Sequence, residues 1–182
     1  MVFSYYHRLS PKQRRIYEAS DRVEAVPLEW TAEFADDVDR LRTALASEVR
    51  ASVERAAQAL AEHLSHQFGI RSVHVRVLER RPSNRYGELH GLYELENTRA
   101  KPVITLWMRT VQRRQVVAFK TFLRTLLHEL VHHLDYEWLK LKDSLHTEGF
   151  YKRESSLLHQ LLDQVPIPSD HTKAGALTSR QD

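Results

Sequence analysis

Cysteine is absent from this chain of 182 residues, and glycine occurs only five times. The missing cysteine excludes disulfides and cysteine-ligated metal sites, and it fits a reducing compartment. No segment approaches the roughly 20 consecutive apolar residues of a membrane-spanning helix, and the N-terminal residues lack the continuous apolar stretch of a signal peptide. We therefore expect a cytoplasmic protein without a membrane partner.

The length and a hydrophobic fraction of 42% suit one domain with a single sizeable core. We expect an N-terminal extension with a short helix over residues 1–31, a single domain over residues 32–165 and a disordered tail over residues 166–182. The tail is polar and has no periodic pattern, so its His171 is not expected to bind metal.

Two helical patterns precede the middle of the chain. A serine followed by proline at the start of residues 10–20 is typical of a helix start and predicts a short basic helix there. From Ala32 onward, apolar residues recur at intervals of three or four positions, which predicts one long amphipathic helix that stops near Phe68 and Gly69. Its apolar stripe most simply forms a core face, and a coiled-coil partner is the alternative.

Three segments have strand character. Residues 73–78 alternate between valine and mostly polar side chains, and residues 89–96 and 102–110 form two further candidates, separated by a polar turn at residues 97–101. Residues 80–87 read as a basic loop. Together with the helices, these strands predict an α+β domain with a small antiparallel sheet. A sheet edge could hold an extended peptide by accepting it as another strand.

The most informative motif is His-Glu-Leu-Val-His at residues 128–132, inside an apolar run from Phe122 to Leu134 that has helical spacing. Four residues make slightly more than one turn, so His128 and His132 project from one face of the helix and could together bind one metal ion. Glu129 lies about 100° away, where it could touch a metal-bound water without joining the ligands. This arrangement is typical of hydrolytic metal sites.

Catalytic zinc usually has three protein ligands and one open position, so a third donor must follow. The candidates are His133, Asp135, Asp143, His146, Glu148 and Glu154. His133 is rotated away from His132, and Asp135 is better placed to hydrogen-bond to a ligand. His146 is the best choice and requires the helix to end near residues 138–141 so that the chain can double back, whereas Glu154 is the alternative.

These residues resemble the SprT-like zinc metallopeptidases. The resemblance rests on the His128–His132 motif, the later His146, Phe150 four residues beyond it and the preceding strands, and it covers residues 72–165. It implies a zincin-like fold with an active-site helix and a C-terminal helix, Glu129 as general base and His146 as third ligand to one Zn²⁺. Thr147 stands where the family often has glycine, and without cysteine the zinc ribbon of many relatives is missing.

The predicted reaction is peptide-bond hydrolysis in a protein or peptide substrate. Zinc would acidify its water towards a pKa of about 7, and Glu129 would remove the proton and later carry it to the leaving amine. The tetrahedral oxyanion requires a further donor, for which Tyr151, Arg153 and His133 are candidates. Two alternatives remain open: a noncatalytic zinc or nucleic-acid binding module, and a zinc hydrolase that acts on a substrate other than protein.

A formal net charge of +3 makes the chain mildly basic. Arginines cluster at positions 14–15, at 80, 81 and 85, and at 109, 113 and 114, but acidic residues are interspersed throughout. Such clusters are more often solvated faces than nucleic-acid surfaces, so nucleic acid is not the favoured partner. The sequence predicts no particular oligomeric state.

Overall fold

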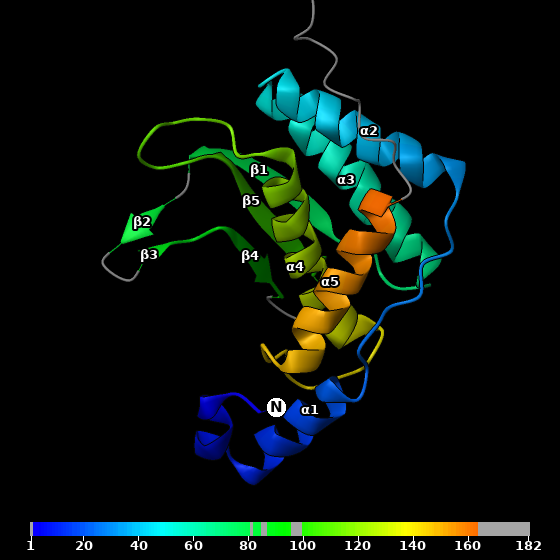
Figure 1. Ribbon diagram of the computed structural model, residues 1–182, viewed down its shortest axis with the longest axis vertical. Coiled ribbons are helices and arrows are strands. Elements are labelled where there is room, and N and C mark those ends of the chain that lie inside the picture. Colours follow the sequence, from blue (N-terminus) through cyan, green and yellow to red (C-terminus); the bar gives the residue numbers. More distant parts are fainter. Residues whose placement is uncertain (1, 81, 85–86, 96–99, 164–182) are drawn as a thin grey trace, which may run out of the picture.

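The computed structural model describes residues 2–80, 82–84, 87–95 and 100–163, and these contain five α-helices, one 3-10 helix and two small sheets (Figure 1). The α+β class is thus confirmed. Within this part of the chain, no helix combines the length and hydropathy needed to cross a bilayer. The predictions for Arg81, Arg85, most of the turn at residues 97–101 and the tail over residues 166–182 lie outside the described residues.

The N-terminal helix forms where the serine-proline pair predicts it. Helix α1, Pro11–Asp21, follows a capping box in which Ser10 and Gln13 satisfy each other's backbone N–H groups, and the 3-10 helix η1, Ser4–Arg8, precedes it. These residues are integrated into the fold, since Tyr17 is fully buried and Val26 belongs to the hydrophobic core. The predicted extension therefore packs against the domain.

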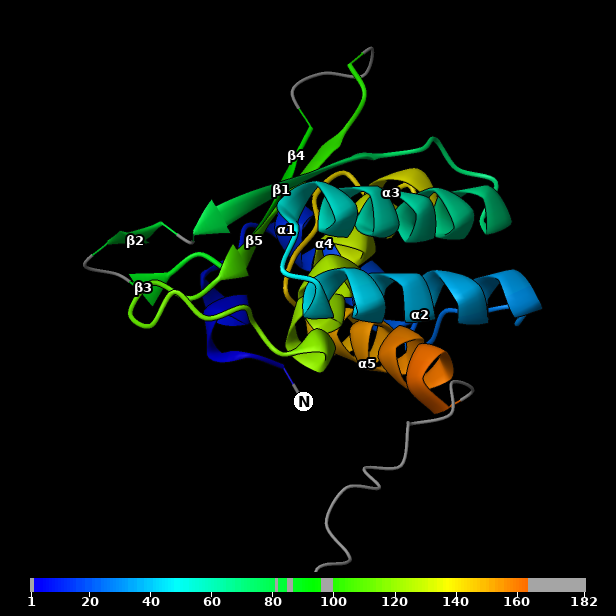
Figure 2. The same cartoon turned by 90° about the horizontal axis from the view of Figure 1, so that it is seen from above.

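The prediction of one long helix was wrong, because the pattern is divided between α2, Ala32–Ala46, and α3, Arg50–Gln67. The chain reverses at Glu48, whose φ of 56° lies in the left-handed region. The two helices lie side by side (Figure 2). The Phe34 ring near the start of α2 stacks on His63 near the end of α3. A single helix over these residues would be about 55 Å long, and folding it back buries both halves of the apolar stripe.

The main sheet is mixed, so the prediction of an antiparallel sheet was also wrong. Its strands β1, His74–Arg80, β5, Val103–Arg109, and β4, Gly91–Glu94, lie in the order β1-β5-β4, with β1 parallel and β4 antiparallel to β5. The predicted basic loop contains a small hairpin of β2, Ser83–Asn84, and β3, Gly87–Glu88. An alternating pattern identifies a strand but specifies neither its neighbour nor its direction.

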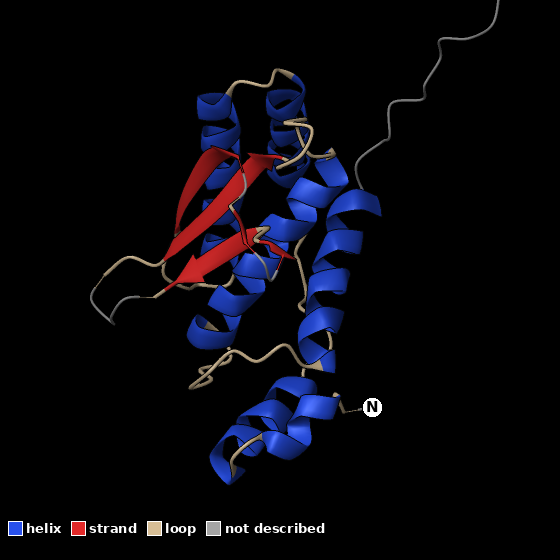
Figure 3. Cartoon of the chain, turned by 90° about the vertical axis from the view of Figure 1, so that its left-hand side faces the viewer, coloured by secondary structure: helices blue, strands red, loops and turns tan. Residues whose placement is uncertain are grey.

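Helices α3 and α4 pack on one face of the main sheet, as Figure 3 shows with the strands towards the viewer. Helix α4, Phe119–Glu137, lies against β4 and β5, and α5, Glu148–Asp163, packs against α4. Core residues on the covered face include Val75, Val77, Ile104 and Leu106, all essentially inaccessible to solvent. This packing holds α4 beside the edge strand β4.

The two edges of the main sheet differ in their hydrogen bonding. Along the outer edge of β1, the Gln58 side chain of α3 accepts from the Val75 N–H at 2.7 Å and donates to the Val73 carbonyl at 2.9 Å. Glu54 likewise accepts from the Val77 N–H at 2.9 Å. Side chains of α3 therefore occupy the β1 edge, whereas β4 pairs only with β5 among the described strands.

Candidate metal centre

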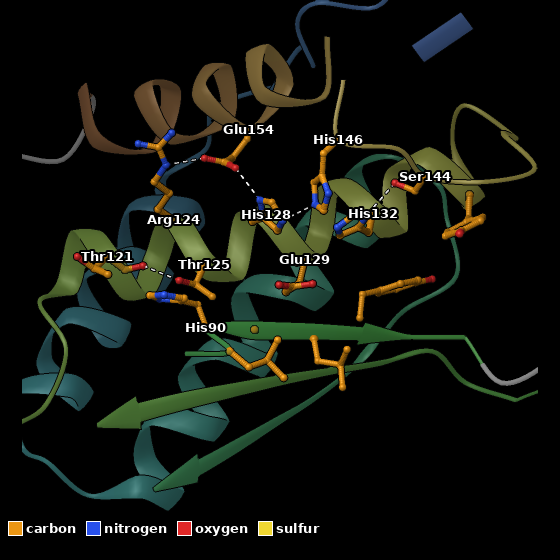
Figure 4. Close-up of a pocket in the computed structure, with 15 residues that line it drawn as sticks. His90, Thr121, Arg124, Thr125, His128, Glu129, His132, Ser144, His146 and Glu154 are labelled. Carbon is orange, nitrogen blue, oxygen red and sulfur yellow. Dashed lines mark hydrogen bonds and ion pairs between the residues drawn. The ribbon is translucent and has the colours of Figure 1, made fainter. Parts of the chain in front are cut away.

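His128 and His132 lie on the face of α4 that looks into a cleft, with ring centroids 5.1 Å apart (Figure 4). The helix forms here because its other faces carry aliphatic side chains, including Leu127, Leu130 and Val131, which are buried in the core. The helical register thus fixes the two rings one turn apart, as the motif predicts.

His146 reaches the same point because α4 ends at Glu137 and the chain doubles back before α5. Lys140, with a φ of 56°, lies in this reversal. The Nε2 atoms of His128 and His146 are 3.0 Å apart, and ligand atoms of the three histidines all lie within 4.8 Å of one another. The predicted helix end and the convergence of three imidazoles are therefore present in the structure.

Two neighbours orient the imidazoles of α4. Glu154 Oε2 lies 2.8 Å from Nδ1 of His128, and because a carboxylate can only accept, this nitrogen carries the proton. Ser144 Oγ donates to Asp135 Oδ2 at 2.8 Å and therefore accepts from Nδ1 of His132 at 2.7 Å. Both rings are thus in the tautomer that leaves Nε2 unprotonated and directed towards the common point.

This geometry fits a metal ion. Tetrahedral zinc with nitrogen ligands at about 2.0 Å separates those nitrogens by roughly 3.3 Å, close to the 3.0 Å between His128 and His146. Burial, followed by the neighbouring histidines, lowers the pKa of His132 to about 3, so this ring stays neutral as a ligand must be.

Phe150 supports all three imidazoles from α5. Its ring centroid lies 4.9 Å from that of His128, 4.7 Å from His132 and 5.0 Å from His146, and the side chain is fully buried. One apolar side chain therefore packs against all three imidazoles, called the triad below. It fixes their spacing and keeps water from the side that faces α5.

Glu129 lies in the same cleft but outside the triad. It is 6% exposed, and burial raises its pKa to about 7, against the lowering effects of His128 and of a hydrogen bond with the Tyr93 backbone. Its carboxylate lies directly over Gly91 of β4, where a Cβ atom would come within 2.4 Å of Oε1. A glycine at this point lets the carboxylate lie between the helix and the edge strand.

The cleft itself has a volume of about 720 Å³ and runs between α4 and β4. Residues 89–93 form one wall of the cleft, and α4 forms the opposite wall. Ser144 and Glu154 line the remaining side. In Figure 4, the metal-ligand candidates lie midway along it, with Arg124 and Thr121 towards one end and Ser144 towards the other. The triad is thus accessible from a groove large enough for several residues of a peptide.

The structure places the three predicted oxyanion donors outside the lining of this cleft. His133 is fully buried, with Nε2 donating to the Arg71 carbonyl at 2.6 Å and Nδ1 accepting from the Tyr93 hydroxyl at 3.1 Å. Arg153 is also fully buried and contacts Asp135 at 2.8 Å. Only Tyr151 lies near the triad, where its half-exposed ring stacks on His146 with centroids 5.9 Å apart.

The alternative ligand Glu154 also has a different place. It is directed to the far side of His128, and its second oxygen accepts from Arg124 Nε at 2.5 Å. Burial alone would raise the pKa of Glu154, but the hydrogen bonds from His128 and Arg124 lower this pKa below its usual value. The carboxylate therefore stays ionised. The geometry therefore favours His146 as the third ligand and Glu154 as the residue that positions His128.

Sequence reasoning missed the contacts between the N-terminal segment and the third-ligand loop. Tyr5 donates to the His146 carbonyl at 2.8 Å, the hydroxyls of Ser20 and Thr147 lie 3.1 Å apart, and Asp21 accepts from the Gly149 N–H at 2.8 Å. These contacts join residues more than 120 positions apart, and no local pattern marks them. They fix the loop that carries His146.

Comparisons with known proteins identify no family. No protein-family model, curated protein or solved structure matches this chain. The resemblance to SprT-like metallopeptidases therefore remains a prediction from the motif, and the functional argument depends on the site itself.

Proposed function

We propose that this protein is a zinc-dependent peptidase. The observation that carries the proposal is the position of Glu129, which is buried in the same cleft as the three imidazoles yet is not one of the converging ligand candidates. A purely structural zinc site would have no use for such a carboxylate and would usually close with a fourth protein ligand.

Each residue of the site has a role in this reaction. When bound, zinc supplies the Lewis acidity that polarises a carbonyl and activates water. Glu129 accepts the proton of the attacking water and returns it to the leaving amine, since the cleft holds its carboxylate beside the ligands. Glu154 and Ser144 hold His128 and His132 in the tautomers required for binding.

The edge of β4 that pairs with no second strand among the described residues favours a peptide over other substrates of hydrolysis. One backbone group of this strand, at Tyr93, already has a hydrogen bond with Glu129. A peptide that adds to β4 as another strand would run along the cleft past Glu129, with its backbone paired to the sheet. The edge of β1 is more fully occupied, because Gln58 and Glu54 bond the backbone at Val73, Val75 and Val77. The asymmetry of the two edges therefore directs an extended chain to the side of the sheet that carries the triad.

Nucleic-acid binding receives less support. Arg109, the centre of one arginine cluster, is paired with Glu48 at 2.8 Å and with Glu79 at 3.2 Å. A guanidinium that is already neutralised by two carboxylates is a poor phosphate contact.

The decisive experiment compares the wild type with Glu129→Gln on an unfolded protein substrate in the presence of zinc. We expect both proteins to bind one zinc ion per chain by metal analysis, and only the wild type to cleave. Glu33→Gln, an exposed glutamate on α2, is the matched control and should cleave normally. Equal cleavage by the Glu129→Gln variant, or no cleavage by zinc-loaded wild type, would overturn the proposal.

A further inference from the structure

The two ends of the cleft have opposite chemical character. At one end, Tyr93 stacks on Tyr136 with ring centroids 5.9 Å apart and lies 6.3 Å from the His132 ring. At the other end, the polar lining residues are Arg124, Thr121, Thr125 and His90, with Glu154 paired to Arg124 (Figure 4) and Leu89 beside His90. The triad and Glu129 lie between an aromatic end and a cationic end.

Arg124 is the charged residue of the cationic end. Its Nε donates to Glu154, and within the described part of the chain its two terminal amino groups make no hydrogen bond. The side chain is 55% exposed and borders the cleft. Unlike Arg109, which is paired with two carboxylates, Arg124 contacts one, and only through Nε. Its two terminal amino groups can therefore donate two parallel hydrogen bonds to a carboxylate of a peptide.

The sheet determines which part of a peptide would meet Arg124. Strand β4 runs from Gly91, near the cationic end, towards Tyr93 at the aromatic end. Antiparallel pairing is the more stable arrangement, and a peptide antiparallel to β4 has its C-terminal half at the cationic end. Arg124 precedes His128 by one helical turn, about 6 Å, which corresponds to roughly two residues of an extended chain at 3.3 Å each.

We infer that the cleft selects peptides with an acidic side chain at the first or second position after the scissile bond, recognised by Arg124, and with an apolar or aromatic side chain before it. This inference rests on the proposed peptidase function for the position of the scissile bond. It adds a substrate class that the metal site alone does not define, because the three histidines and Glu129 act on the backbone only.

The test measures binding separately from cleavage. Three fluorescein-labelled peptides are titrated by anisotropy into the zinc-loaded Glu129→Gln variant: one with two glutamates after a central phenylalanine, one with two glutamines there, and one with the two glutamates before the phenylalanine. We expect the first to bind roughly three- to tenfold more tightly than the other two, with a preference that shrinks as salt is added.

Arg124→Gln, added to the Glu129→Gln variant, should abolish this ratio, because glutamine can still donate to Glu154 but carries no charge. Each ratio compares peptides on the same protein, so any effect of the substitution on the metal site cancels. Arg40→Gln, which removes an exposed arginine of α2 remote from the cleft, should leave the ratio intact.

Equal binding of the first two peptides, or a ratio that survives Arg124→Gln, would overturn the inference. Tighter binding of the third peptide would overturn the stated direction. If the wild type cleaves none of the peptides while the Arg124-dependent ratio holds, the proposed peptidase activity fails and the recognition of acidic peptides stands.

Discussion

Glu154 and His128, on two different helices, are joined by a contact of 2.8 Å between carboxylate Oε2 and ring Nδ1. The glutamate is 3% exposed and ionised, and it determines which nitrogen of the ring is available to a metal. Such partners strengthen and orient ligands, and their loss typically weakens metal affinity.

Replacing this partner should therefore weaken zinc binding. We expect Glu154→Ala to lower zinc affinity roughly 10- to 100-fold, measured by competition with a chromogenic chelator at neutral pH. Glu154→Gln should lose less, because its amide oxygen can still accept from His128. An unchanged affinity in Glu154→Ala would show that the contact does not support the site.

The third ligand can be tested through stability. Zinc at 100 times its dissociation constant should stabilise the wild type by about 2.7 kcal/mol, seen as a rise in Tm. At the same zinc concentration, His146→Ala should show a much smaller rise, while His159→Ala, an exposed histidine of α5, should behave as wild type. An equal rise in His146→Ala would remove His146 from the site and reopen Glu154 as a ligand.

The buried ion pair between Asp135 and Arg153 should be essential to folding. Both side chains are fully buried, and their atoms lie 2.8 Å apart. We expect Asp135→Ala to lower the free energy of unfolding by about 3–5 kcal/mol, because it removes the carboxylate that is paired with the buried guanidinium charge. Urea denaturation of the metal-free protein measures this without contribution from zinc. Asp39→Ala, which breaks an exposed pair with Arg42, should cost at most about 1 kcal/mol.

Gly149 provides a test of the N-terminal contacts. A Cβ there would lie 2.6 Å from the Ser20 carbonyl oxygen and 2.7 Å from the Asp21 Cα, both backbone atoms. We expect Gly149→Ala to cost about 1–3 kcal/mol of stability and also to weaken zinc binding, because α1 would be displaced from the third-ligand loop. Gly69 has a φ of 59°, which strains an alanine, but open space surrounds it. Gly69→Ala should therefore lower stability without weakening zinc binding.

Gly91 provides a test of Glu129 that leaves the ligands in place. In Gly91→Ala, the new methyl group would force the Glu129 carboxylate to move, since the added Cβ would lie only 2.4 Å from the present position of Oε1. We expect kcat/KM to fall roughly 100-fold with zinc content unchanged. Leu78→Ala, an exposed position on β1, serves as control. Full activity in Gly91→Ala would contradict the position assigned to the carboxylate.

Local spacing predicted the part of the site that belongs to α4. The spacing of four positions from His128 to His132 sets the two rings one turn apart in any helix, and the requirement that His146 return to them predicted the end of α4. The same reasoning failed for the oxyanion donors. His133 and Arg153 are near the site in sequence, but their directions are set by distant partners such as Arg71 and Ser20.

The sheet shows the same limit. Alternation identified the residues of β1, β4 and β5, but the placement of β5 between the other two depends on pairing between residues far apart in the chain. The apolar pattern of α2 and α3 likewise continues without a break across the reversal at Glu48, so it predicted a single helix. Periodicity indicates which side chains are buried but not where the chain turns.

The sequence by itself determined the histidine pair, the acid beside it and the α+β class, since each follows from spacing over one or a few turns. Only the tertiary structure decided that Glu154 supports His128, that β4 pairs with no second strand among the described residues and that residues before Pro27 hold the loop of His146. These relations join separate elements, and their geometry is set by packing of the whole core, which no local pattern encodes.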